Sequence, residues 1–207
     1  MESPREARKG QRAVKTEIAR ADILAMPAYQ LVRNERRAAA RAAKQNRQVA
    51  VGPFATFTFE NYDSMWLQVH EMLRAEKGGE EQIADELSAY NPLVPKGREL
   101  VATLMFEIEE PARRARELGR MGGAEEQVFF KLESESVRGV PEQDTERSTP
   151  DGRTASVHFL HFPFSDAQVR AFRSGRGDLT LEIRHPNYRH AAGIAEAVRR
   201  ELAQDFA

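Results

Sequence analysis

The chain has 207 residues, 41% of them hydrophobic and 30% charged, which is the composition of a globular protein with one well-formed core. It contains no cysteine, which excludes disulfides, thiolate zinc sites, a cysteine nucleophile and a cysteine-ligated iron–sulfur cluster. No apolar run approaches the length of a membrane span, and the charged N-terminus lacks a signal-peptide core. We therefore expect a cytoplasmic protein with no membrane segment.

Charge is distributed unevenly along the chain, although the formal total is −1. Residues 1–50 carry twelve Lys and Arg against five Asp and Glu, a net charge of +7, and the remainder has a net charge of −8. Such asymmetry indicates a basic surface for an acidic partner or an arm that contacts nucleic acid. Within the basic part, residues 1–20 are polar and nearly free of large apolar side chains. They predict a disordered tail ahead of a single domain at 21–207.

The segment 29–47 is rich in Ala and Arg and has high helix propensity. Its spacing places four cations on one face: Arg33, Arg37, Arg41 and Lys44. The opposite face is Ala-rich and only weakly apolar. A solvated helix lying on the acidic body of the protein is the simpler interpretation. Phosphate contact is the alternative, but no aromatic side chains interleave with the charges, so nucleic-acid binding ranks last.

The most strongly patterned helix follows Asn61, a plausible N-cap, and stops at Gly78-Gly79. Its apolar residues form a stripe that we expect to dock on a sheet: Tyr62, Met65, Trp66, Val69, Met72 and Leu73. Glu76 falls inside that stripe, where it is an exposed last-turn carboxylate, an acid with a raised pKa or metal ligand, or a structural ion-pair partner. His70 lies at the border of the stripe, four residues from Arg74, and the two side chains could clamp an anion.

The remaining elements alternate between strands and helices. Strands are predicted at 49–59, 100–108, 127–133, 154–162 and 179–183, with residues 134–140 forming a hairpin with the third of these. Helices are predicted at 80–90, from Pro111 to Gly122, from Ser165 to Gly175, and from Asn187 to Leu202. Residues 141–152 form a polar loop that is the best candidate for a mobile segment. This order predicts an α+β fold with a mostly antiparallel sheet covered by helices.

A candidate binding pocket combines the Trp66 helix with the loop that follows the next helix. Its residues are His70, Arg74, Glu76, Tyr90, Asn91 and, from the strand packed below, His158. His158 and His161 cannot bind one ion together, because residues three apart on a strand point to opposite faces. No metal-binding motif, nucleophile elbow or Walker loop is present, so no metal or cofactor is assigned.

Several short motifs, taken in order, resemble the uncharacterised bacterial family catalogued as domain of unknown function 3501. They are Glu71-Met72-Leu73-Arg74, Glu86-Leu87, Tyr90-Asn91-Pro92-Leu93-Val94-Pro95, Ala102-Thr103-Leu104 and Ser156-Val157-His158-Phe159-Leu160. The resemblance runs from about Ile18 to the C-terminus. It implies no activity and no catalytic residues. It does imply a setting, since members are often encoded beside a rubrerythrin-like di-iron protein and a cysteine-rich iron–sulfur oxidoreductase.

Three functions follow from these observations. The leading hypothesis is a non-enzymatic accessory or binding protein of an oxidative-stress redox system, which could dock one redox protein against another. The second is an enzyme or a binder of a metal or small molecule, built around His70. The third is nucleic-acid binding through the basic face of the helix at 29–47.

Overall fold

Alternating apolar residues place the strands of the described chain in two antiparallel sheets. The structure, a computed structural model, describes residues 14–133, 135–142 and 152–207. The first sheet has the strand order β1 (Gln48–Val51), β2 (Ala55–Glu60), β3 (Glu99–Phe106), β7 (Val157–Pro163) and β6 (Val140–Pro141). The second sheet has the order β5 (Glu135–Arg138), β4 (Val128–Leu132), β8 (Leu179–His185) and β9 (Tyr188–Gly193). The prediction of an α+β fold with antiparallel strands is confirmed, with two sheets rather than one.

The inner faces of the two sheets form the larger hydrophobic core. Phe130 of the second sheet lies between Phe59 and Phe162 of the first, with ring centroids 5.6 and 4.9 Å apart. Apolar side chains of α5 (Asp166–Ser174) and α6 (Glu196–Leu202) join this core. The helix α4 (Pro111–Leu118) lies in the connection between β3 and β4.

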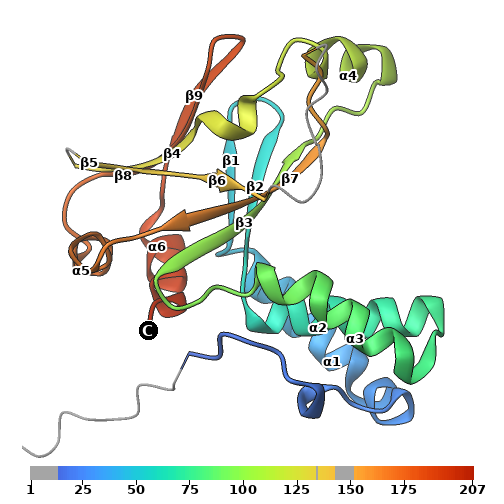
Figure 1. The fold of residues 1–207 in the computed structure, drawn as a ribbon. Helices are drawn as coiled ribbons and strands as arrows, with labels where there is room; N and C mark the ends of the chain where they lie inside the picture. The colour runs from blue at the N-terminus through green and yellow to red at the C-terminus, as the bar shows by residue number, and fades with distance from the viewer. Residues whose placement is uncertain (1–13, 134, 143–151) are drawn as a thin grey trace, which may run out of the picture.

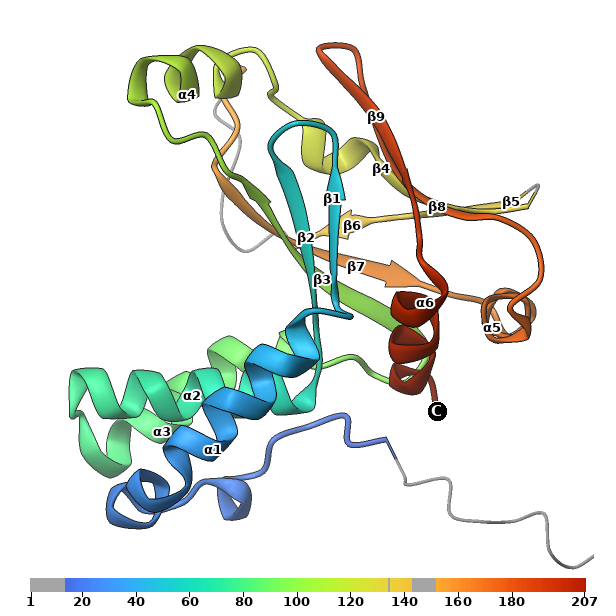
Figure 2. The same cartoon turned by 180° about the vertical axis from the view of Figure 1, so that it is seen from behind.

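Three helices form a separate bundle at one end of the sheets (Figures 1 and 2). They are α1 (Met26–Lys44), α2 (Tyr62–Glu76) and α3 (Gly79–Tyr90). The apolar stripe of α2 packs in a second core, with Tyr29 of α1, Ile83 of α3, and Val101 on the outer face of the first sheet. The expectation that the Trp66 helix lies flat on a sheet is therefore wrong. Helix α2 packs mainly on α1 and α3, because they bury its stripe.

The segment before α1 is part of the folded domain from residue 14 onward. Ile18 is only 1% exposed and Ile23 only 7%, and both belong to the second core. The predicted tail at 1–20 therefore ends too late, because two buried isoleucines hold this segment on the second core although most of its other side chains are polar. Residues 1–13, the rest of that tail, lie outside the described residues.

The predicted strand at 49–59 is a hairpin of two strands, β1 and β2, that pair antiparallel. The turn begins at Gly52, whose φ of +73° is a left-handed conformation that favours glycine. The Tyr188 hydroxyl donates to the carbonyl of Val51 at 2.7 Å and accepts from the amides of Phe54 and Ala55. Because the alternation of apolar and smaller or polar residues continues through the turn, it predicted a single strand.

The prediction of one helix from Asn187 to Leu202 is wrong in its first half. Residues 188–193 form β9, which pairs with β8 through a tight turn in which His185 faces Tyr188. Helix α6 begins only at Glu196. Pairing with β8 outweighs the helix propensity of the alanines in this segment.

Val140 and Pro141 leave the second sheet and pair with β7 in the first. The centre of the predicted mobile loop, residues 143–151, lies outside the described residues. Within residues 14–133, 135–142 and 152–207, the structure contains no helix with the length and apolar character needed to cross a membrane.

Replacing Gly52 with Ala should lower the free energy of unfolding by about 2 kcal/mol, because the left-handed conformation disfavours a side chain. The added Cβ would also lie 2.6 Å from Cγ of His190 and 2.7 Å from the Tyr188 hydroxyl. Urea unfolding measures the change. Gly193→Ala is the control, because its Cβ would meet no atom within 4 Å. Equal losses in the two variants would contradict the assigned turn.

Candidate binding groove

His70 is a buried residue of α2, and both of its ring nitrogens contact the main chain. Its Nδ1 lies 2.8 Å from the carbonyl of Trp66, and its Nε2 lies 3.0 Å from the amide nitrogen of Leu24. Because a carbonyl only accepts and an amide N–H only donates, the imidazole is neutral with its proton on Nδ1. Burial lowers the pKa of His70, which favours the same form. Arg74 is exposed, so these two residues do not form the predicted anion clamp.

Asn91 holds the main chain of the N-terminal segment. Its side-chain oxygen accepts from the amide of Ile18 at 2.8 Å, and its side-chain nitrogen donates to the carbonyl of Ile18 at 3.0 Å. Together with His70, it therefore fixes residues 14–25 against the helices. Tyr90 is half-buried, and its hydroxyl accepts from Gln68 at 3.4 Å.

The other two residues of the predicted pocket lie elsewhere. Glu76 is exposed at the end of α2 and accepts from Gln82 at 2.9 Å, so the simplest of its three interpretations fits the structure. His158 is fully buried on the inner face of the first sheet, where its Nε2 lies 2.8 Å from Oγ1 of Thr154. Strand alternation turns Phe159, not His158, toward the helices. The predicted pocket therefore does not assemble.

Arg33, which was predicted on the basic face of α1, forms an internal ion pair instead. Arg33 donates from Nε and Nη2 to the two carboxylate oxygens of Glu71, each at 2.7 Å, and Tyr29 donates to the same carboxylate at 2.6 Å. These contacts, led by the Arg33 hydrogen bonds, lower the pKa of Glu71 to about 2. They fix α1 to α2 near the N-terminal end of α1.

The remaining cations of that face line a groove beneath the C-terminal half of α1. The groove has a volume of about 920 Å³ and runs between α1, the N-terminal half of α2 and the outer face of the first sheet. Arg37, Arg41 and Lys44 are exposed along its wall. None of the three forms an ion pair with any residue the structure describes. Arg36 joins them and lies over the Trp66 ring at 5.2 Å.

The floor of the groove is the outer face of the first sheet. Thr58 and Thr103 face each other in neighbouring strands, and Met105 is 40% exposed. Glu60 accepts hydrogen bonds from Ser64 and Thr103, each at 2.7 Å, so its carboxylate is satisfied locally. Sequence reasoning missed Arg36, Met105 and this floor. The Ala-rich face of α1 was the one sequence signal for this open space, because alanine side chains are too small to fill the space above a sheet.

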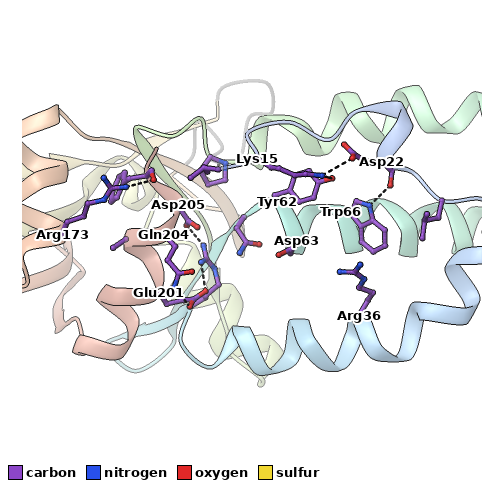
Figure 3. A pocket seen from close by; sticks show the side chains of 17 residues that line it. Lys15, Asp22, Arg36, Tyr62, Asp63, Trp66, Arg173, Glu201, Gln204 and Asp205 are labelled. Carbon is purple, nitrogen blue, oxygen red and sulfur yellow. Dashed lines mark hydrogen bonds and ion pairs between the residues drawn. The ribbon is translucent and has the colours of Figure 1, made fainter. Parts of the chain in front are cut away.

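A second cavity of about 840 Å³ adjoins the groove and shares Trp66, Asp63 and Glu201 with it. Figure 3 shows Glu201, Gln204 and Asp205 on one side and Tyr62 and Trp66 on the other.

Arg47 is buried between these parts. It donates to the carbonyl of Phe59 at 2.9 Å and to that of Glu60 at 3.1 Å, and it pairs with Asp205. Burial raises the pKa of Asp205 to about 6, and the Arg47 charge only partly opposes this. Arg47 therefore fixes the C-terminal end of α1 and the last turn of the chain to the first sheet.

The described residues contain no cluster of three His, Asp or Glu side chains that could hold a metal ion. The groove instead combines an open volume, a row of cations and a floor that carries both apolar side chains, such as Met105 and Phe159, and the hydroxyls of Thr58 and Thr103. Such a surface can attract acidic groups by charge.

Comparison with known proteins assigns the chain to a family. The sequence model of the family described as "Protein of unknown function (DUF3501)" matches residues 17–206. The chain therefore belongs to this family, as the resemblance predicted. A crystal structure of a "novel protein of unknown function" from Burkholderia pseudomallei K96243 is 36% identical, with a TM-score of 0.84. The match covers 92% of this chain and 99% of that one. No curated protein matches the chain.

Replacing Asp205 with Asn should change how stability depends on pH. A pKa raised from 3.8 to about 6 means that the neutral acid stabilises the folded state at low pH, and this contribution is lost as the pH rises through about 6. The Asn side chain of Asp205→Asn does not ionise, so this variant does not lose stability as the pH rises through about 6. Its free energy of unfolding should therefore improve relative to the wild type by up to about 3 kcal/mol between pH 4 and pH 7.

Chemical denaturation at a series of pH values measures this difference. Gln204→Ala, a neutral neighbour in the same cavity, is the control and should show no such trend. A difference between Asp205→Asn and the wild type that stays constant over this range would contradict the assigned burial of the carboxyl group.

Proposed function

We propose that this protein is a non-enzymatic binding protein that docks an acidic partner protein on the groove beneath α1. The row of Arg37, Arg41 and Lys44, exposed and without an ion pair among the described residues, is the observation that carries the proposal. Cations in this state keep their charge available for a partner. The guanidinium groups of the first two can also bind carboxylates through two parallel hydrogen bonds.

The proposed setting is an oxidative-stress redox system in the cytoplasm. The family resemblance points to a rubrerythrin-like di-iron protein and a cysteine-rich iron–sulfur oxidoreductase as the partners. Because this chain has no cysteine, it would not itself carry a thiolate-bound cluster. Its role would be to hold one redox protein in place or to bring two together.

The competing functions draw less support. A metal- or substrate-binding pocket around His70 would need an accessible imidazole, whereas His70 is 0% exposed and both ring nitrogens contact the main chain. Nucleic-acid binding would use the same cations, but Trp66 is 8% exposed and Arg36 covers its ring. That leaves little aromatic surface for base stacking.

Reversing the charge of the groove should abolish docking. The combined variant Arg37→Glu, Arg41→Glu, Lys44→Glu should weaken binding to the purified di-iron or iron–sulfur partner at least tenfold, since like charges then face each other. Calorimetry at low and moderate ionic strength measures this, and wild-type binding should weaken with added salt.

The matched control carries the same charge change on exposed arginines outside the groove: Arg113→Glu, Arg176→Glu and Arg189→Glu. It should bind like the wild type. Equal effects of the two triple variants on binding would contradict the proposal. So would a wild-type protein that binds neither the di-iron nor the iron–sulfur partner at low salt. Salt-dependent retention on DNA or RNA that the groove variant alone loses would favour the third function instead.

A further inference from the structure

Alanines form the roof of the groove where larger side chains would be expected. Ala39, Ala40 and Ala43 of α1 line it. A helix that packs on other elements usually presents leucine or isoleucine there, and protein interiors are filled to the density of organic crystals. Three methyl groups cannot fill this space, and about 920 Å³ stays open. Among residues 26–44, all within the described chain, Tyr29 is the one buried side chain.

The groove combines apolar side chains of the sheet, Met105 and Phe159, with the cations of α1. Met105 is 40% exposed, and the Thr103 hydroxyl donates its hydrogen bond to Glu60. The floor therefore suits an apolar group better than a charged one. The cations line α1 above it, and Arg37 to Lys44 spans about 10 Å of helix.

We infer that the groove binds an acidic segment of a partner protein that carries one large apolar side chain. The apolar side chain fills the space between the alanines and Met105, and carboxylates on either side of it pair with Arg37, Arg41 and Lys44. A free fatty acid fits this arrangement less well, because its single carboxylate cannot neutralise cations spread over that length. The inference rests on the proposed docking function and adds the chemistry of the segment that is docked.

Synthetic peptides test the inference directly. One peptide is made of Asp and Glu around a central Phe, and a second has Ala in place of that Phe. Trp66, the only tryptophan of the chain, lines the groove and reports binding by its fluorescence. The Phe peptide should bind roughly tenfold more tightly than the Ala peptide, the effect of burying one aromatic side chain.

A variant that fills the groove distinguishes the contribution of the open space to binding from that of the cations. Ala40→Leu places a larger side chain in the groove and leaves every cation intact, so it should weaken binding of the Phe peptide and of the partner roughly tenfold. Ala38→Leu is the matched control, because residue 38 is exposed on α1 outside the groove. Circular dichroism melting checks that both variants fold, and Ala40→Leu should melt no lower than the wild type.

Three results would overturn the inference: equal affinity for the two peptides, no effect of Ala40→Leu in a folded protein, or binding of decanoate with no binding of either peptide. Its failure is distinguishable from failure of the docking function. If the charge-reversal variant loses the partner while Ala40→Leu keeps it, docking stands and the apolar anchor is wrong. If neither variant affects the partner, docking through this groove is itself wrong.

Discussion

Helix α1 is held to the rest of the protein at its two ends rather than along its length. Near its start, the Glu71 carboxylate accepts from both Arg33 and Tyr29. Just after its end, the buried Arg47 bonds two main-chain carbonyls and Asp205. Such partly or fully buried ion pairs set position more than they add stability. Because the helix is fixed in this way, its middle needs no large apolar side chains, and the groove stays open beneath it.

Polar residues of α2 and of the turn after α3 also serve the fold. His70 and Asn91 bind the main chain of residues 14–25, which closes the helical bundle on the side away from the sheets. Fully paired, buried polar groups of this kind are costly to rearrange. A buried imidazole with both nitrogens engaged is therefore not free for chemistry. The cations of α1 that line the groove stay exposed above a floor that carries Met105.

Periodicity predicted the fold class, β3, β7 and the Asn61 cap of α2, because these depend on local pattern. It failed at 49–59 and 187–195, where a turn at Gly52 and pairing with β8 decide the structure. The residues of the predicted pocket do not come together, for a related reason. The sequence placed His70 near the Tyr90 loop, but it could not show that Leu24 would cap the imidazole. The basic face was predicted in part, since Arg33 turned inward and the other three cations stayed exposed.

We expect the space under α1 to accept an apolar group from a partner. Methyl NMR of the six methionines tests it most directly. With an acidic, Phe-bearing peptide or the partner added, the Met105 methyl resonance in the groove should shift under the ring current of the bound aromatic side chain. The Met121 methyl, buried in the other core, should not. A Met105 resonance that stays in place while the ligand binds would contradict the account.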